Sequence, residues 1–219
     1  MDPALAGAID PDARAALVHE LSVTDRLMLD PAGNGAAIAV LVLMLAALAV
    51  VGADVVAGRI RVPVAPAWVI LVLGAVGMAV AAYLGFVEVT GAEAVCGPVG
   101  DCNTVQQSAY ARILGVPVGV LGVVGYAVIL ATWLTGRVAG GPVPRLAGRA
   151  VWWLALVATA FSVYLTVLEP FVIGASCAWC LTSALVATLL LLAATPGLRG
   201  RDAERSVGVS PTRRPSVSH

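Results

Sequence analysis

The sequence predicts an all-α integral membrane protein with five membrane-spanning helices. Apolar residues make up 60% of the 219 positions and charged residues only 12%, and the mean hydropathy is +0.95. A soluble domain carries about 25% charged residues, so this composition is typical of a chain that lies in a lipid bilayer. The formal net charge of 0 excludes a generally basic nucleic-acid-binding protein, and we expect no nucleic acid among the partners.

Stretches without charged side chains give the positions of the spans. A helix crosses the hydrocarbon with about 17–25 residues, and five charge-free stretches reach this length, at 35–53, 62–87, 113–136, 150–168 and 170–198. Glu169 alone separates the last two, so we expect a tight turn over 169–174. The first thirty residues do not resemble a cleavable signal peptide, so the first span is expected to act as its own anchor.

The distribution of arginine predicts the orientation. Short loops rich in Arg stay in the cytoplasm. The loops after the first and third spans and the C-terminal tail hold ten arginines and three carboxylates, a net charge of +7, whereas the opposite face carries −7. We therefore expect a multi-pass protein of the inner (plasma) membrane, with its N-terminus outside the cytoplasm and its C-terminus inside.

All four cysteines lie on the predicted outer face. Cys96 and Cys102 follow the second span, and Cys177 and Cys180 form a Cys-x-x-Cys motif at the start of the fifth. Cysteines that serve as small packing residues would be scattered through the spans. Their restriction to the oxidising side indicates disulfide chemistry instead.

The two pairs differ in their expected local structure. Ser176 is the expected N-cap of the last helix, which places Cys177 at its first position and Cys180 one turn deeper on the same face. Free N–H groups and the helix dipole stabilise a thiolate at such a position, so Cys177 is expected to be the more activated thiol. Cys180, being deeper, is expected to face an apolar electron acceptor.

The loop pair lies on a glycine-rich segment. Gly97, Pro98 and Gly100 favour a turn that brings Cys96 and Cys102 within disulfide range. Asn103 is then expected to cap a short helix over 103–113. A mobile dithiol beside an activated one is typical of a relay that works by thiol–disulfide exchange.

These motifs together resemble the vitamin K epoxide reductase family over about 62–195. The resemblance is carried by Cys96-x5-Cys102, by Ser108 six residues later, by Gly-Val-Pro-Val-Gly-Val-Leu-Gly at 115–122, and by Cys177-x-x-Cys180. It implies a four-helix bundle around a quinone. It further implies that Cys180 is the thiol next to the quinone, Cys177 its disulfide partner and relay target, Cys96 and Cys102 the shuttle, and Ser108 a quinone-binding residue.

The resemblance also implies the partners. Bacterial members resemble DsbB in role, because they reoxidise a DsbA-like thioredoxin-fold protein and pass its electrons to menaquinone or ubiquinone. We expect a separate partner protein here and no metal. The expected organisation is an acidic outer tail (1–34), an additional N-terminal transmembrane helix (35–57), a four-helix catalytic core (62–197) with an outer loop (88–112), and an Arg-rich cytoplasmic tail (198–219).

Two other interpretations remain open at this point. Four thiolates can form the tetrahedral shell of a structural zinc site. Alternatively, two static disulfides would clamp a structural or transport bundle. The favoured hypothesis is a membrane thiol:quinone oxidoreductase, and an assay separates it from the static bundle because static disulfides do not turn over quinone.

Overall fold

The computed structural model describes residues 17, 20–58, 62–63, 65–97 and 100–198, so most of both predicted tails lies outside the described residues, as does Pro98. The long helices are α4 (Pro31–Val56), α5 (Ala67–Thr90), α7 (Val118–Val138), α8 (Val143–Leu168) and α9 (Ala178–Ala194). The shorter elements are α3 (Val23–Leu27), α6 (Cys102–Gln106), β1 (Arg112–Ile113), β2 (Val116–Pro117), two 3-10 turns, η1 (Ala109–Ala111) and η3 (Thr195–Leu198), and one π-helical turn, η2 (Glu169–Ile173).

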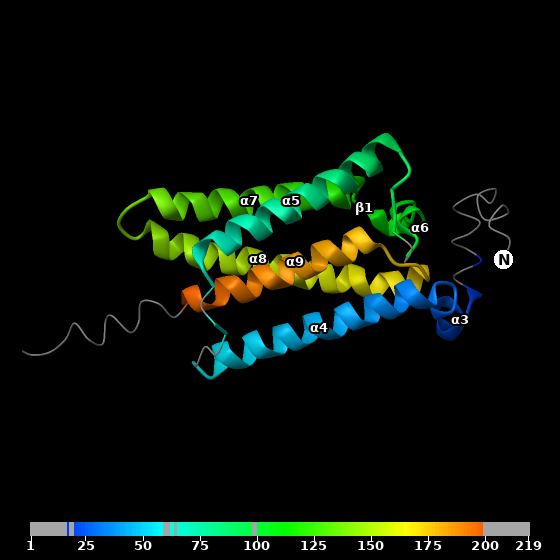
Figure 1. The fold of residues 1–219 in the computed structure, drawn as a ribbon, viewed down its shortest axis with the longest axis horizontal. Coiled ribbons are helices and arrows are strands. Elements are labelled where there is room, and N and C mark those ends of the chain that lie inside the picture. The colour runs from blue at the N-terminus through cyan, green and yellow to red at the C-terminus, as the bar shows by residue number, and fades with distance from the viewer. Residues whose placement is uncertain (1–16, 18–19, 59–61, 64, 98–99, 199–219) are drawn as a thin grey trace, which may run out of the picture.

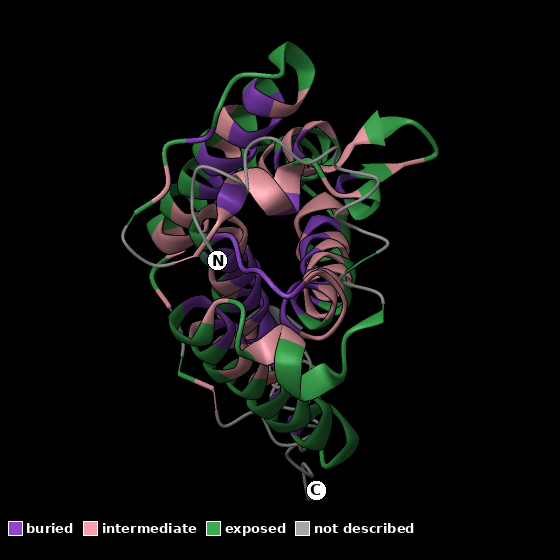
Figure 2. Ribbon diagram, turned by 90° about the vertical axis from the view of Figure 1, so that its right-hand side faces the viewer, coloured by how far each residue is buried: buried purple, intermediate pink, exposed green. Residues whose placement is uncertain are grey.

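Four of the long helices form a closed bundle, and the fifth lies outside it. Helix α5 packs against α7 and α9, and α8 packs against the same two helices from the other side (Figure 1). Helix α4 lies along the outer surface of α8 and α9, and it also contacts α3 and η2. Viewed from the end that carries α6, the buried residues gather on the sides of the helices that face one another (Figure 2). The predicted architecture, a four-helix bundle with one additional N-terminal helix, is confirmed.

The helix lengths agree with a membrane location. Helices α4, α5 and α7, and the continuous helix Val143–Ile173, are long and apolar enough to cross a membrane, whereas α9 is a shorter apolar helix of 17 residues. Helix α9 is shorter than its charge-free stretch because the start of that stretch, 170–177, leads from α8 to α9 and its end forms the 3-10 turn η3.

Glycines bring α5 and α7 into close contact. A methyl group added at Gly119 would overlap the backbone of Gly85, so the two chains can approach this closely only without a side chain at that point. Further along, the space beside Gly77 is filled by the ring of Tyr126. The central core that these contacts enclose includes Ile129, Trp152 and Leu190.

The connection between α8 and α9 is a widened helical turn followed by an extended segment. Pro170 has no N–H to continue an α-helix, and the chain forms a π-helical turn over Glu169–Ile173. Gly174 ends this turn with a φ of +76° and donates its N–H to the carbonyl oxygen of Glu169 over 2.8 Å. The tight turn expected over 169–174 is therefore displaced: residues 169–173 continue the helix, and the non-helical connection to α9 is 174–177. This connection lies at the same end of the molecule as α3 and α6 (Figure 1).

Candidate active site

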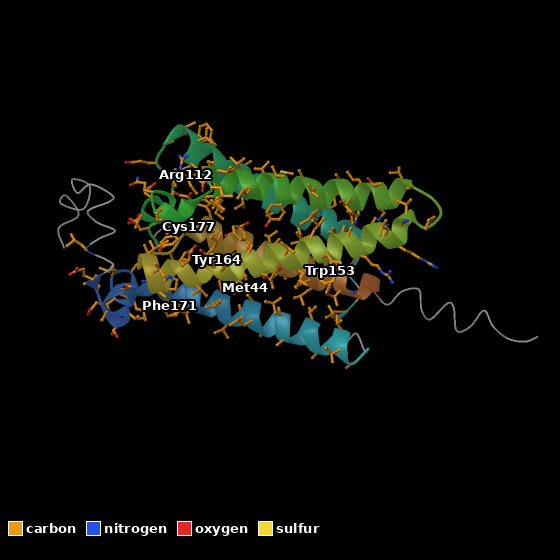
Figure 3. All side chains as sticks on the ribbon, turned by 180° about the vertical axis from the view of Figure 1, so that it is seen from behind. Met44, Arg112, Trp153, Tyr164, Phe171 and Cys177 are labelled. Carbon is orange, nitrogen blue, oxygen red and sulfur yellow. A yellow bond between two sulfur atoms is a disulfide. The ribbon has the colours of Figure 1, made fainter. Side chains whose placement is uncertain are left out.

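The fold brings all four cysteines together at one end of the bundle. Cys102 and Cys177 are fully buried in a common apolar cluster, and Cys96 and Cys180 pack against it. Cys96 and Cys102 form a disulfide with a Cα–Cα distance of 5.9 Å, while Cys177 and Cys180 are free thiols. Cys177 lies at the end of the molecule that also carries Arg112 (Figure 3). The disulfide therefore lies against the Cys-x-x-Cys motif.

The segment before the disulfide is held to the bundle by side chains. The indole N–H of Trp179 donates to the carbonyl oxygen of Val95 over 2.9 Å, and the backbone N–H of Val95 donates to the Tyr83 hydroxyl over 2.8 Å. The side chain of Asn103 accepts the N–H of Ala94 over 2.7 Å. Trp179 lies between the two cysteines of the motif, so the loop is attached to the motif itself.

The helix after the disulfide differs from the one predicted. Asp101, rather than Asn103, caps it by accepting the N–H of Thr104 over 3.1 Å. The helix α6 ends at Gln106, and the expected continuation to Ile113 is wrong, because the chain turns into η1 and the β1–β2 hairpin. Asn103 is unavailable as a cap because its amide holds the Ala94 backbone.

The backbone of the loop that carries the Cys96–Cys102 disulfide also contacts the segment before Cys177. Gly100 has a φ of +91°, and a methyl group there would overlap the carbonyl oxygen of Ser176. The next residue, Asp101, donates its N–H to that same oxygen over 2.9 Å. Glycine thus meets both requirements at position 100, a left-handed backbone and close approach.

Cys177 itself caps helix α9. The helix begins at Ala178, one residue later than predicted, and the Sγ of Cys177 accepts the N–H of Cys180 over 3.4 Å. The hydrogen bond from the Cys180 thiol, with weaker ones from backbone N–H groups and from Gln106, lowers the pKa of the Cys177 thiol despite its burial. This is the environment of an activated thiol.

Cys180 faces a cavity that Cys177 does not line. The cavity, of about 280 Å³, lies between α5, α7, α8 and α9, and apolar side chains make up most of its wall. The polar groups of the wall include Glu88, Gln106, Ser108 and Glu169. The two thiols of the motif therefore have different surroundings, one beside the loop disulfide and the other on the cavity.

Ser108 is placed in the wall of this cavity, where its hydroxyl donates to the carbonyl oxygen of Val105 over 2.7 Å. Glu88 reaches the start of α7 and accepts the N–H of Gly119 over 2.7 Å. Within the described ranges, no group of three or more His, Cys, Asp or Glu side chains is arranged to hold a metal ion.

Two residues of the site are missed by the sequence reasoning. Glu169 is only 2% exposed, and its carboxylate accepts the N–H of Cys177 over 3.2 Å. The amide nitrogen of Gln106 lies 3.9 Å from the Sγ of Cys177 and 3.7 Å from that of Cys180, while its buried oxygen has no hydrogen-bond partner among the described residues. The isolated charge of Glu169 between two apolar stretches is a signal in the sequence, whereas Gln106 has none.

Comparison with known proteins agrees with this geometry. The sequence profile of the vitamin K epoxide reductase family matches residues 68–195, which include all four cysteines. The thiol-disulfide oxidoreductase LTO1 of Arabidopsis thaliana is 32% identical over 136 residues, covering 58% of this chain and 35% of LTO1. This chain thus corresponds to about a third of that relative.

Proposed function

This chain belongs to the vitamin K epoxide reductase family, and from that premise we propose that it is a membrane thiol:quinone oxidoreductase that supports disulfide bond formation. In this function it reoxidises a separate DsbA-like thioredoxin-fold protein outside the cytoplasm and passes the electrons to a membrane quinone. The observation that carries the proposal is the separation of the two thiols: Cys177 is buried against the loop disulfide, and Cys180 lines the apolar cavity.

The electrons would pass through two exchange reactions within the chain. The partner's dithiol reduces the Cys96–Cys102 disulfide and leaves as a disulfide. The loop dithiol then reduces a Cys177–Cys180 disulfide, which restores the loop disulfide and leaves the helix pair as two thiols. The arrangement in the structure, with the loop pair joined and the helix pair free, corresponds to the product of this second exchange.

The cavity fits a quinone head group. Its volume of about 280 Å³ is just below the range of about 300–1,000 Å³ found for small-molecule sites, which are also mostly apolar with a few polar groups. A bound quinone supplies an acceptor for two electrons and two protons. Formation of the Cys177–Cys180 disulfide releases two electrons and two protons, which would reduce the quinone to hydroquinone.

We assign supporting roles to the polar groups around the motif. Gln106 directs its amide N–H groups at both sulfur atoms and stabilises negative charge on them during exchange. Glu169 holds the N–H of Cys177 and lines the cavity together with Glu88, so these two carboxyls are placed to exchange protons beside Cys180. Ser108 contributes one of the hydroxyl groups in the cavity wall, and we propose that this hydroxyl contacts the quinone.

A variant that fills the cavity tests the proposal. Gly125 lines the cavity and has open space where a side chain would begin, so Gly125→Leu places a large apolar side chain in the quinone site and favours the helix. With a reduced thioredoxin-fold protein as donor, quinone reduction followed by absorbance should fall by about tenfold or more. The donor should still reduce the cysteines of this variant once, in a single turnover that does not require quinone.

The matched control is Gly52→Leu, because Gly52 is exposed on α4 and also has open space around it. This variant should reduce quinone as fast as the unmodified protein. Full quinone reduction by Gly125→Leu would contradict the assignment of the cavity. The absence of any turnover in the unmodified protein would favour static disulfides.

A further inference from the structure

The first turn of α4, the helix outside the bundle, reaches the segment that carries Cys177. Asn34 in this turn is 1% exposed, and its amide nitrogen lies 3.2 Å from the carbonyl oxygen of Gly174. The amide oxygen accepts the hydroxyl of Ser176 over 3.0 Å. A buried amide is costly unless its groups are hydrogen-bonded, and both ends of Asn34 are used on the 174–176 segment.

The same amide is fixed on its own side. Its nitrogen also lies 3.2 Å from the carbonyl oxygens of Arg26 and Leu27, at the end of α3. Arg26 in turn donates from its guanidinium to the carbonyl oxygen of Phe171 over 2.9 Å, and Phe171 lies beside this end of α4 (Figure 3). The N-terminal helices therefore hold the α8–α9 connection at two places.

Ser176 is the residue at which three segments meet. It is 1% exposed, its side chain is bonded to Asn34, and its carbonyl oxygen accepts the N–H of Asp101 from the shuttle loop. A methyl group at Gly33 of α4 would come within 3.0 Å of the Cα of Gly100, so α4 and the shuttle loop are also in contact. The next residue along the chain is Cys177.

We propose that the additional N-terminal helix is a working part of the redox site and that Asn34 is a positioning residue for the exchange between the two cysteine pairs. The Asn34–Ser176 bond holds Cys177 in its extended conformation, with φ −112° and ψ 115°, in which the sulfur caps α9. It also holds the Ser176 carbonyl where Asp101 docks. The inference rests on the proposed function, in which the two cysteine pairs exchange a disulfide, but its test requires neither quinone nor a protein partner.

The experiment follows the transfer of one disulfide within the full-length protein. Both cysteine pairs are oxidised, one equivalent of a small dithiol is added, and samples are quenched in acid, alkylated after denaturation and analysed by mass spectrometry. This gives the rate at which the disulfide passes between the helix pair and the loop pair, and its final distribution. In Asn34→Leu, which keeps the size but loses the amide and its bonds to Gly174 and Ser176, transfer should be at least about tenfold slower.

Ser176→Ala removes only the hydroxyl and should slow transfer similarly. Because both changes break the Asn34–Ser176 bond, the double variant should be little slower than Asn34→Leu alone. Met44→Ala is the control: Met44 is fully buried on the same helix, in its middle, so this variant weakens helix packing and should leave the transfer unchanged.

Unchanged transfer in Ser176→Ala overturns the proposal, even if Asn34→Leu does not fold. Equal slowing by Met44→Ala also overturns it, since the effect would then be one of general stability. If the unmodified protein transfers the disulfide but reduces no quinone, the proposed function fails while the role of Asn34 stands.

Discussion

The backbone N–H of Asp101 donates to the carbonyl oxygen of Ser176 over 2.9 Å, which joins the residue before Cys102 directly to the residue before Cys177. The two cysteine pairs are thus brought together through backbone groups that do not take part in the exchange. A single hydrogen bond contributes about 0.5–1.5 kcal/mol to stability. A bond of this strength helps to align the two pairs, and its loss alone would cost little if the loop undocks.

Substitution of Gly100 should undock the loop. Gly100→Ala places a methyl group against the Ser176 carbonyl and forces a left-handed backbone that costs roughly 1–2 kcal/mol for a residue with a side chain. We expect slower disulfide transfer between the pairs and a disulfide that external reductants reach faster. Gly97 in the same loop has open space around it and no left-handed backbone. Gly97→Ala should therefore behave as the unmodified protein in both measurements.

Cys180→Ser should abolish quinone reduction, because Cys180 is the cysteine of the motif that lines the cavity. Cys177 should still be trapped in a mixed disulfide with a loop cysteine, which non-reducing proteolysis and mass spectrometry would detect. Turnover of quinone by Cys180→Ser at the rate of the unmodified protein would show that another group donates the electrons.

The loop disulfide should act as a shuttle rather than a clasp. It closes so short a segment that it contributes less than the about 3 kcal/mol expected for a 15-residue loop, so stability is a weak reason for it. Cys96→Ala and Cys102→Ala should each stop electron flow from the protein donor, while a small dithiol that reaches the Cys177–Cys180 disulfide directly still drives quinone reduction. Loss of activity with both donors, together with a lower melting temperature, would indicate a structural clasp.

The thiolate of Cys177 should depend on the hydrogen bond from position 180. With Cys96 and Cys102 replaced by Ala, Cys177 is the sole thiol in both Cys180→Ser and Cys180→Ala, and its ionisation is followed by ultraviolet absorbance against pH. The hydroxyl of Ser keeps a donor where the Cys180 thiol lowers the pKa of Cys177. The Ser variant should therefore ionise at lower pH than the Ala variant.

The same difference should appear in stability. A thiol whose pKa is lower in the folded state stabilises the fold above its unfolded pKa, and this contribution disappears as the pH falls through the folded value. The melting temperature of the Ser variant should thus exceed that of the Ala variant. The difference should grow as the pH rises from the folded-state pKa of Cys177 to its unfolded-state pKa. Identical titration curves would rule out the donor at position 180 as the cause.

The orientation predicted from arginine places the loop disulfide outside the cytoplasm. In intact cells whose disulfides have been reduced, a membrane-impermeant thiol reagent should label Cys96 or Cys102, and a reporter joined after His219 should lie in the cytoplasm. A C-terminal reporter found outside would contradict the whole arrangement, since the cysteines would then face the reducing cytosol.

The sequence by itself determined the membrane class, the number and order of the long helices, and the end of the bundle at which the cysteines gather. These properties depend on local composition, because a long stretch without charged side chains is favoured in the bilayer whatever it packs against. The location of the four cysteines at one end of the bundle likewise follows from their positions next to those stretches in the sequence.

Only the tertiary structure decided which polar groups serve the cysteines. Ser176 is a good N-cap by its local sequence, but its hydroxyl is bonded to Asn34, and the cap of α9 passes to Cys177. Glu169 is the first residue of the π-helical turn, and its position there brings its carboxylate within hydrogen-bond distance of the Cys177 N–H. Such contacts join residues far apart in the chain, and their geometry exists only once the helices have packed, since a hydrogen bond depends on distance and direction rather than on residue type alone.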